Sequence, residues 1–178
     1  MEALDAQLSA QLAEGDLDAL GLLYQRHGAH LRSFLLRVEP TMSREDADDL
    51  TQETFLTFHK KIGGYTEQGK LRSFLFGIAA RKTKAWRRKR WWRGALRFQQ
   101  GEAASGTSLH RENPEGRLAA REQLVAALDA LPPAQRQVLI LNVVEGLSVQ
   151  ETADALGIQE NAVSTRLYRA RRTLKEIR

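Results

Sequence analysis

The chain has 178 residues, 42% of them hydrophobic and 28% charged, with a formal net charge of +5 and no cysteine. This length allows one domain of ordinary size or two small ones, and the missing cysteine excludes disulfides, cysteine zinc sites and a thiol nucleophile. Because no apolar run approaches about 18 residues and the start does not read as a signal peptide, we expect a soluble cytoplasmic protein without a membrane span.

Positive charge is concentrated in two segments. Residues 71–100 contain 10 basic and no acidic side chains, and the final 13 residues contain 6 basic and 1 acidic. Residues 1–70, in contrast, carry a net charge of −5. A cationic segment without counter-charges repels itself, so it favours a polyanionic partner over a merely solvated face. Nucleic acid is the first candidate for that partner, and an anionic membrane surface is the second.

The hydrophobic spacing in the first half predicts three helices. The first covers about residues 16–38 and is ended by Pro40. The second covers about residues 43–62 and begins with Ser43, which is followed three residues later by an acidic side chain as in a capping box. The third begins at residue 71 and continues into the basic segment. No window shows the alternation of a half-buried strand.

Residues 94–116 lose this periodicity and are rich in small and polar side chains. Such a segment cannot offset the entropy cost of ordering the chain, so we expect a flexible linker there. Helical periodicity resumes after it, and Ser148 with Glu151 forms a capping-box pattern. The sequence therefore predicts an all-α fold with two small helical domains, residues 1–93 and 117–178.

The second domain ends in a helix-turn-helix pattern. A short helix follows Ser148, Gly157 supplies the turn, and a longer basic helix covers about residues 160–177. One side of the long helix is apolar. The other side carries Ser164, Thr165, Arg166, Tyr168, Arg169, Arg171 and Arg172. Such a helix can lie in the major groove of DNA and read base edges, although a helical hairpin with a basic surface is the alternative for this segment alone.

The basic segment at residues 81–93 interleaves its cations with Trp86, Trp91 and Trp92. This combination suits single-stranded or melting nucleic acid, because cations follow the phosphates and rings stack on exposed bases. Trp86 could equally belong to the core at the end of the third helix. The tryptophan pair lies so close to the linker that burial of both rings is harder to arrange.

The second helix carries an acidic stretch at residues 45–53. These carboxylates cannot face DNA, because like charges repel. Part of their role is a favourable interaction of acidic side chains with the positive end of the helix dipole. Their number on the outer side also predicts a docking surface for a basic protein partner.

Several segments carry a family resemblance in a specific order. They read Asp-Ala-Asp-Asp-Leu-Thr-Gln-Glu-Thr-Phe, then Ser-Phe-Leu-Phe-Gly-Ile-Ala, then, after the linker, Leu-Pro-Pro-Ala-Gln-Arg-Gln-Val-Leu, Glu-Gly-Leu-Ser and Gly-Ile-Gln-Glu-Asn-Ala-Val-Ser-Thr-Arg-Leu-Tyr-Arg-Ala-Arg. Together they resemble the extracytoplasmic-function (ECF) sigma factors of bacterial RNA polymerase, over about residues 17–93 and 117–178.

This resemblance implies partners and site residues. It implies binding to core RNA polymerase through the clamp coiled coil of the β′ subunit and the β flap, binding to promoter DNA, and control by an anti-sigma factor. The clamp contact would use Asp48, Asp49, Gln52 and Glu53. The −10 element would contact Tyr65, Lys70, Arg72, Arg81, Lys82, Lys84, Trp86, Arg87 and Arg88. The outer residues of the last helix would read the −35 element.

Two positions depart from the family pattern. Arg81 stands where family members commonly have Asn, and Ala85 where they often have Asp. Both changes make the −10 site more cationic. We therefore expect the site to discriminate less between DNA bases and to bind the DNA phosphates more tightly.

Parts of the sequence also fit two other functions. A stand-alone helix-turn-helix regulator would bind duplex DNA tightly by itself, normally as a dimer on a palindrome. A nucleotide-hydrolysing switch would use residues 64–71, which nearly match a phosphate-binding loop but lack its closing Ser or Thr and follow a helix. The four histidines complete no metal-site spacing. We therefore expect no metal, no cofactor and no catalysis.

Overall fold

The computed structural model describes residues 2–65, 70–99 and 125–176. Its elements are α1 (Glu2–Ala13), α2 (Leu17–Val38), α3 (Arg44–Lys61), the 3-10 turn η1 (Ile62–Gly64), α4 (Leu71–Gln99), α6 (Pro133–Leu139), the π-helical turn η2 (Ile140–Val144), α7 (Val149–Leu156) and α8 (Glu160–Glu176). Residues 125–129 are also helical, and the described ranges contain no strand. The all-α prediction is confirmed.

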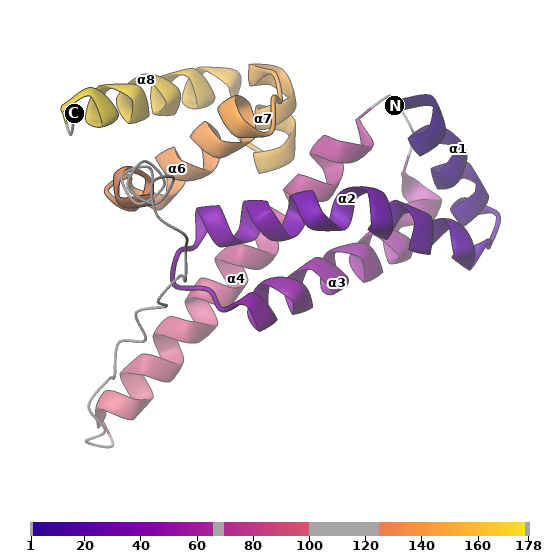
Figure 1. The fold of residues 1–178 in the computed structure, drawn as a ribbon, viewed down its shortest axis with the longest axis horizontal. Coiled ribbons are helices and arrows are strands. Elements are labelled where there is room, and N and C mark those ends of the chain that lie inside the picture. The colour runs from indigo at the N-terminus through magenta and orange to yellow at the C-terminus, as the bar shows by residue number, and fades with distance from the viewer. Residues whose placement is uncertain (1, 66–69, 100–124, 177–178) are drawn as a thin grey trace, which may run out of the picture.

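The first four helices form an N-terminal bundle (Figure 1). α2 packs against α1 and α3, and α4 packs across α2 and α3. Phe34, Phe58 and Phe76 are fully buried where these helices meet, and the rings of Phe34 and Phe76 lie edge to face with centroids 5.1 Å apart. Each buried ring of this kind contributes about 1.5–3 kcal/mol through removal of apolar surface from water.

The C-terminal unit, residues 125–176, contains the helix-turn-helix. Val163, Leu167 and Ala170 of α8 are buried, and α8 packs against α6 and α7. Gly157 ends α7 with φ of 64°, the left-handed conformation that glycine adopts without strain. This conformation turns the chain sharply enough for α8 to lie across α7.

Side-chain caps fix where two helices begin. The Ser43 hydroxyl accepts a hydrogen bond from the backbone N–H of Asp46 at 3.0 Å, at the start of α3. At the start of α7, Ser148 and Glu151 form the full reciprocal capping box predicted from the sequence. The backbone N–H of Ser148, and then its hydroxyl, hold the pKa of Glu151 below its ordinary value because they stabilise the carboxylate.

Two features differ from the sequence-based expectations. α1 was not predicted, because the alanines and leucines of residues 2–13 surround the helix without forming one apolar stripe; Leu8 and Leu12 are nevertheless buried. α4 continues to Gln99, past residue 94 where the linker was expected to begin, and extends away from the bundle (Figure 1). The remainder of the expected linker, residues 100–116, lies outside the described residues.

The N-terminal bundle and the C-terminal unit pack against each other. α7 lies on α4, and η2 and α6 lie against α2. Buried apolar side chains of both parts belong to one continuous cluster. This packing decides which of the candidate functional residues are accessible.

Candidate functional site

The acidic surface of α3 faces outward. Asp49, Gln52 and Glu53 are exposed and Asp48 is half-buried. Asp48 accepts a hydrogen bond from Arg32 of α2 at 3.2 Å, and Glu53 accepts one from Lys82 of α4 at 2.9 Å. Exposed ion pairs of this kind contribute about 0–1 kcal/mol, so a basic partner can replace them at little cost.

Leu56 adds an apolar residue to this surface that the sequence analysis missed. Its side chain is 56% exposed, and it lies seven, four and three residues after Asp49, Gln52 and Glu53, on the same side of α3. We call these four residues, together with Asp48, the docking face. The helical spacing could have revealed Leu56, because it is an apolar residue on the polar side of an amphipathic helix.

The basic residues of α4 are divided between two environments. Arg81, Lys84 and Arg88 are exposed. Lys82 is half-buried in its pair with Glu53, and Arg87, also half-buried, donates a hydrogen bond to Glu39 at 2.8 Å. Among the described residues, Arg81, Lys84 and Arg88 have no carboxylate within hydrogen-bond reach. Of the five predicted −10 cations in this stretch, these three are therefore the ones best placed to bind phosphates.

The three tryptophans of α4 separate in the same way. Trp86 is 9% exposed, which favours the alternative that it belongs to the core, and the Arg90 guanidinium lies 5.4 Å from its ring centroid. Trp91 and Trp92 are 64% and 57% exposed, and their rings meet edge to face with centroids 5.0 Å apart. The exposed pair therefore offers stacking surface that Trp86 does not.

A pocket of about 390 Å³ lies beside the start of α4. Tyr65, Lys70, Phe74 and Arg81 line it from the N-terminal bundle, and Asp154 and Ala155 line it from α7. The rings of Tyr65 and Phe74 pack with centroids 5.0 Å apart. Three of the predicted −10 residues, Tyr65, Lys70 and Arg81, are thus brought together around one cavity, whereas Trp86 and Arg87 are not among the residues that line it.

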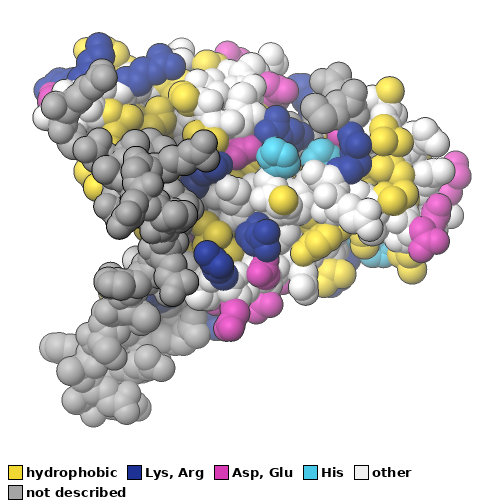
Figure 2. All heavy atoms as spheres, in the orientation of Figure 1, with side chains coloured by type: hydrophobic (Ala, Val, Ile, Leu, Met, Phe, Trp, Pro, Cys, Tyr) yellow, Lys and Arg dark blue, Asp and Glu magenta, His cyan; other side chains and the backbone are white. Residues whose placement is uncertain are grey.

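The outer side of α8 carries the predicted −35 residues. Ser164, Thr165, Tyr168, Arg169, Arg171 and Arg172 are exposed, and Arg166 is half-buried. The buried stripe on the opposite side holds this orientation, and Figure 2 shows basic side chains along the upper edge of the molecule, where α8 lies in Figure 1. We call these seven residues the reading face.

The described residues contain no group of three or more His, Asp or Glu side chains arranged to hold a metal ion. None of the described helices is long and apolar enough to cross a membrane.

Comparisons with known proteins identify two family regions along the chain. The family described as Sigma-70 region 2 matches residues 23–93, and that described as Sigma-70, region 4 matches residues 121–174. The RNA polymerase sigma factor CnrH of Cupriavidus metallidurans is 32% identical, over 99% of this chain and 95% of CnrH. The ECF RNA polymerase sigma factor SigM of Mycobacterium tuberculosis is 30% identical, over 99% of this chain and 85% of SigM.

Solved structures show the same fold. CnrH in complex with the cytosolic domain of CnrY is 26% identical, with a TM-score of 0.70 over 98% of this chain and 96% of CnrH. The sigma factor RpoE of Bartonella quintana, solved in complex with the anti-sigma factor NepR, is 24% identical, with a TM-score of 0.70 over 88% of this chain and 94% of RpoE. Because the first match spans nearly the whole chain, its likeness includes both the bundle and the C-terminal unit.

Proposed function

The chain belongs to the sigma-70 family, in its ECF group, and from this membership we propose how its surfaces direct core RNA polymerase to promoters. It is a sigma factor rather than a stand-alone regulator. In our proposal it selects the promoter and binds the opened DNA strand, while the polymerase catalyses RNA synthesis. The observation that carries the proposal is the order of the two family regions along the chain, with an exposed and chemically suitable surface on each.

The docking face would bind the clamp coiled coil of the β′ subunit. Asp48 pairs with Arg32 and Glu53 pairs with Lys82, both near the surface, so a basic partner can displace these cations. Leu56 would supply the apolar centre that charged rims usually surround in protein interfaces. Electrostatic attraction at the rim raises the association rate, and burial of Leu56 slows dissociation.

The start of α4 and the pocket beside it would capture the opened −10 strand. Arg81, Lys84 and Arg88 are positioned to hold phosphates, and the pocket beside Tyr65 and Phe74 would take an unpaired base. Stacking of a base on an aromatic ring contributes about 1–3 kcal/mol, which is comparable to the few kcal/mol that extruding the base costs. Arg81 is exposed and can contact a phosphate, and the exposed Ala85 places no negative charge beside it.

The reading face of α8 would lie in the major groove at the −35 element. The four arginines of this face have side chains long enough to approach both guanine edges and phosphates. Each of the two DNA contacts is modest, but their linkage through one chain raises the effective concentration of the second contact once the first has formed.

An inhibitor is part of the proposal. Relatives of known structure are bound to CnrY and to the anti-sigma factor NepR, and we infer that this chain is also controlled by an anti-sigma factor. The inhibitor, like the polymerase and the promoter, would act in the cytoplasm.

Reconstituted transcription tests the proposed function. Purified chain and core polymerase should co-elute on size exclusion, and the complex should give discrete run-off transcripts from genomic fragments that core polymerase alone does not transcribe specifically. Tight palindrome binding by a dimer of the free chain, without any effect on start-site choice, would instead support the stand-alone regulator.

A further inference from the structure

Two neighbouring tryptophan rings of α4 lie in solvent without a role in the function proposed so far. Trp91 and Trp92 follow Arg88, the last residue that the family resemblance assigns to the −10 element. Each of the two is more than half exposed, and their rings meet at an interplanar angle of 77°. Adjacent exposed side chains of this size are typical of a binding surface rather than of a solvated one.

The tryptophan pair continues a row of cations along α4. We call Arg81, Lys84 and Arg88, which are all exposed, the cationic stripe. At about 100° per residue, Trp92 lies in line with Arg81 and Arg88, and Trp91 lies on the Lys84 side of that line. The three cations and the two rings fall within about 120° of the helix circumference and extend over about 16 Å of its length. Cations and rings therefore share one side of the helix.

The opposite side of α4 anchors this part of the helix to the bundle. Trp86 is buried there. Arg87 donates a hydrogen bond to Glu39 at 2.8 Å, and Arg90 donates one to the backbone carbonyl of Thr41. Both acceptors belong to the connection between α2 and α3. Because the backbone beneath the tryptophan pair is held in this way, a ligand of the two rings would have little of the helix to order on binding.

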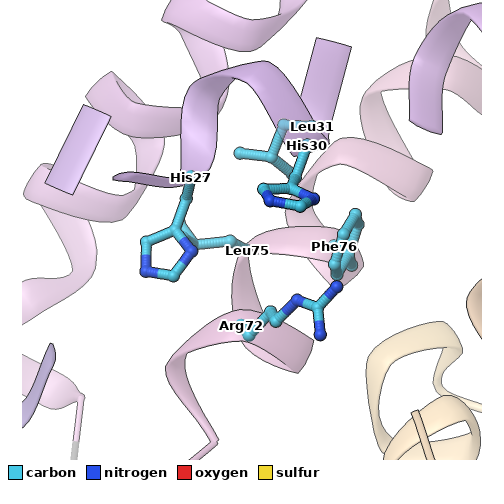
Figure 3. A pocket seen from close by; sticks show the side chains of 6 residues that line it. All are labelled: His27, His30, Leu31, Arg72, Leu75 and Phe76. Atoms are coloured by element: carbon cyan, nitrogen blue, oxygen red, sulfur yellow. The ribbon is translucent and has the colours of Figure 1, made fainter. Parts of the chain in front are cut away.

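The first arginine of α4 shows that a cation of this helix can be committed elsewhere. Arg72 lies nine residues before the stripe begins, which is about half a turn away around the helix. Figure 3 shows it beside His30 and Phe76, and its guanidinium lies 5.6 Å from the centroid of the Phe76 ring. It also donates a hydrogen bond to the buried Glu145 at 2.9 Å. Arg72 is therefore held by protein groups, on a different side from the stripe.

The arrangement of the stripe and the rings favours one kind of polyanion. Exposed arginines and lysines bind phosphates, and exposed aromatic rings stack on unpaired bases, whose faces are not covered by a duplex stack. A helix that lies in a membrane interface instead carries its aromatic side chains on the side opposite its cations. Because α4 presents both kinds of side chain on the same side, its chemistry fits a single strand better than a lipid surface.

We propose that Trp91 and Trp92 form a base-stacking site for single-stranded nucleic acid, with the strand backbone lying along the cationic stripe. The inference rests on the proposed function and extends its −10 surface by one helical turn past Arg88. Rings that meet at 77° cannot enclose a base between parallel faces, so one ring stacks on a base and the other supports it. The site therefore takes one unpaired base and tolerates any of the four, because every base has a π-face.

The test compares two fluorescent 12-nucleotide strands with the same phosphates, one carrying all its bases and one made entirely of abasic sites. Because the stripe and the rings are exposed, the full chain can be titrated by fluorescence anisotropy without polymerase. The double variant Trp91→Ala/Trp92→Ala removes both rings, and Trp91→Phe/Trp92→Phe keeps aromatic faces. Leu22→Ala is the matched control, because Leu22 is an exposed apolar residue of α2 outside the docking face, the reading face and the −10 surface.

The unaltered chain and Leu22→Ala should bind the base-bearing strand about 5- to 150-fold more tightly than the abasic strand, as expected for stacking of one base. The double alanine variant should lose this preference and keep its affinity for the abasic strand, and the double phenylalanine variant should keep most of the preference. Arg88→Gln should weaken the binding of both strands alike, because it removes a phosphate contact.

The absence of a preference in the unaltered chain would overturn the proposal, and so would a double alanine variant that keeps the preference or loses affinity for both strands equally. Ring-dependent binding to phosphatidylglycerol vesicles, without a preference between the strands, would also overturn it and assign the pair to a lipid surface. A chain that directs run-off transcription but shows no base preference refutes this inference alone. A chain with the ring-dependent preference that never redirects polymerase refutes the proposed function alone.

Discussion

The two proposed DNA-binding surfaces of this sigma factor differ in how their side chains are held. The reading face of α8 is exposed and held by a buried apolar stripe, so it is ready to enter a groove. On the −10 surface, Lys70, Arg72 and Lys82 are paired with carboxylates of other segments. An exposed helix suits recognition of intact duplex, whereas cations that are already paired must leave their carboxylates before they can bind phosphates.

Trp86→Ala should have the largest effect on stability, about 3 kcal/mol, because it empties a buried site. Trp91→Ala should leave the free energy of unfolding nearly unchanged and instead weaken single-strand binding by about 1–3 kcal/mol, because that ring is exposed. Chemical denaturation and fluorescence anisotropy measure the two quantities. A larger loss of stability for Trp91→Ala than for Trp86→Ala would refute the assignment of Trp86 to the core.

Charge reversal of Asp49 and Glu53 to Lys should weaken core polymerase binding by about 2–3 kcal/mol, because like charges would then face a basic coiled coil. Binding of the −35 duplex should be unaffected. The control reverses Glu14 and Asp18, which are also exposed acids but lie outside the docking face. Equal core affinity for the two double variants, measured by competition with a labelled sigma factor, would contradict the docking assignment.

Arg169→Ala should cost about 1–3 kcal/mol of −35 duplex affinity if the side chain makes a bidentate base contact, and it should relax the sequence preference at one position. Lys175→Ala, at the far end of the same helix, should cost less and affect all sequences equally. Titrations of both variants against a set of single-base substitutions separate these effects. A uniform loss for Arg169→Ala would reassign it to the phosphates.

Ser148→Ala should lower stability by about 1 kcal/mol, because it removes the cap of α7. We expect urea unfolding of the variant to show this loss. Ala134, on the exposed side of α6, provides a comparison when changed to Ser, which should have a smaller effect. An unchanged midpoint for Ser148→Ala would show that the capping box contributes nothing to folding.

The smallest effect concerns pH. The pKa of Glu151 is lowered in the folded protein, chiefly by the Ser148 backbone N–H, so its contribution to stability is present above the ordinary carboxyl pKa and is lost as the pH falls through the lowered value. In the Glu151→Gln variant, the free energy of unfolding should therefore fall slightly less steeply as the pH is lowered. If the free energy of unfolding of the variant and of the unaltered protein depended on acidic pH in the same way, Glu151 would not be a source of that dependence.

Local signals in the sequence predicted the local structure well. The caps at Ser43 and Ser148 and the glycine at 157 each act within a few residues, and the structure has helix boundaries at all three. The helix-turn-helix followed from the same kind of signal. The −35 prediction depended on one helix, whose buried stripe determines what faces outward, and the structure exposes most of the predicted side chains.

Features that depend on distant contacts were not predictable in this way. The burial of Trp86 depends on which side of α4 meets the bundle, and a tryptophan among cations fits either environment. Glu145 and Arg72 are 73 residues apart, and neither is unusual in its own segment. α1 is buried through its contacts with α2 and η1 rather than through a pronounced apolar stripe of its own.

Footprinting of the reconstituted polymerase complex on one of its own promoters tests the central claim most directly. The account predicts protection at two separated elements only when chain and core polymerase are both present, with permanganate-reactive thymines confined to the −10 side. It also predicts that the free chain leaves both elements unprotected at the same concentration. Protection of a single palindromic site by the free chain, unchanged by polymerase and without reactive thymines, would contradict the account.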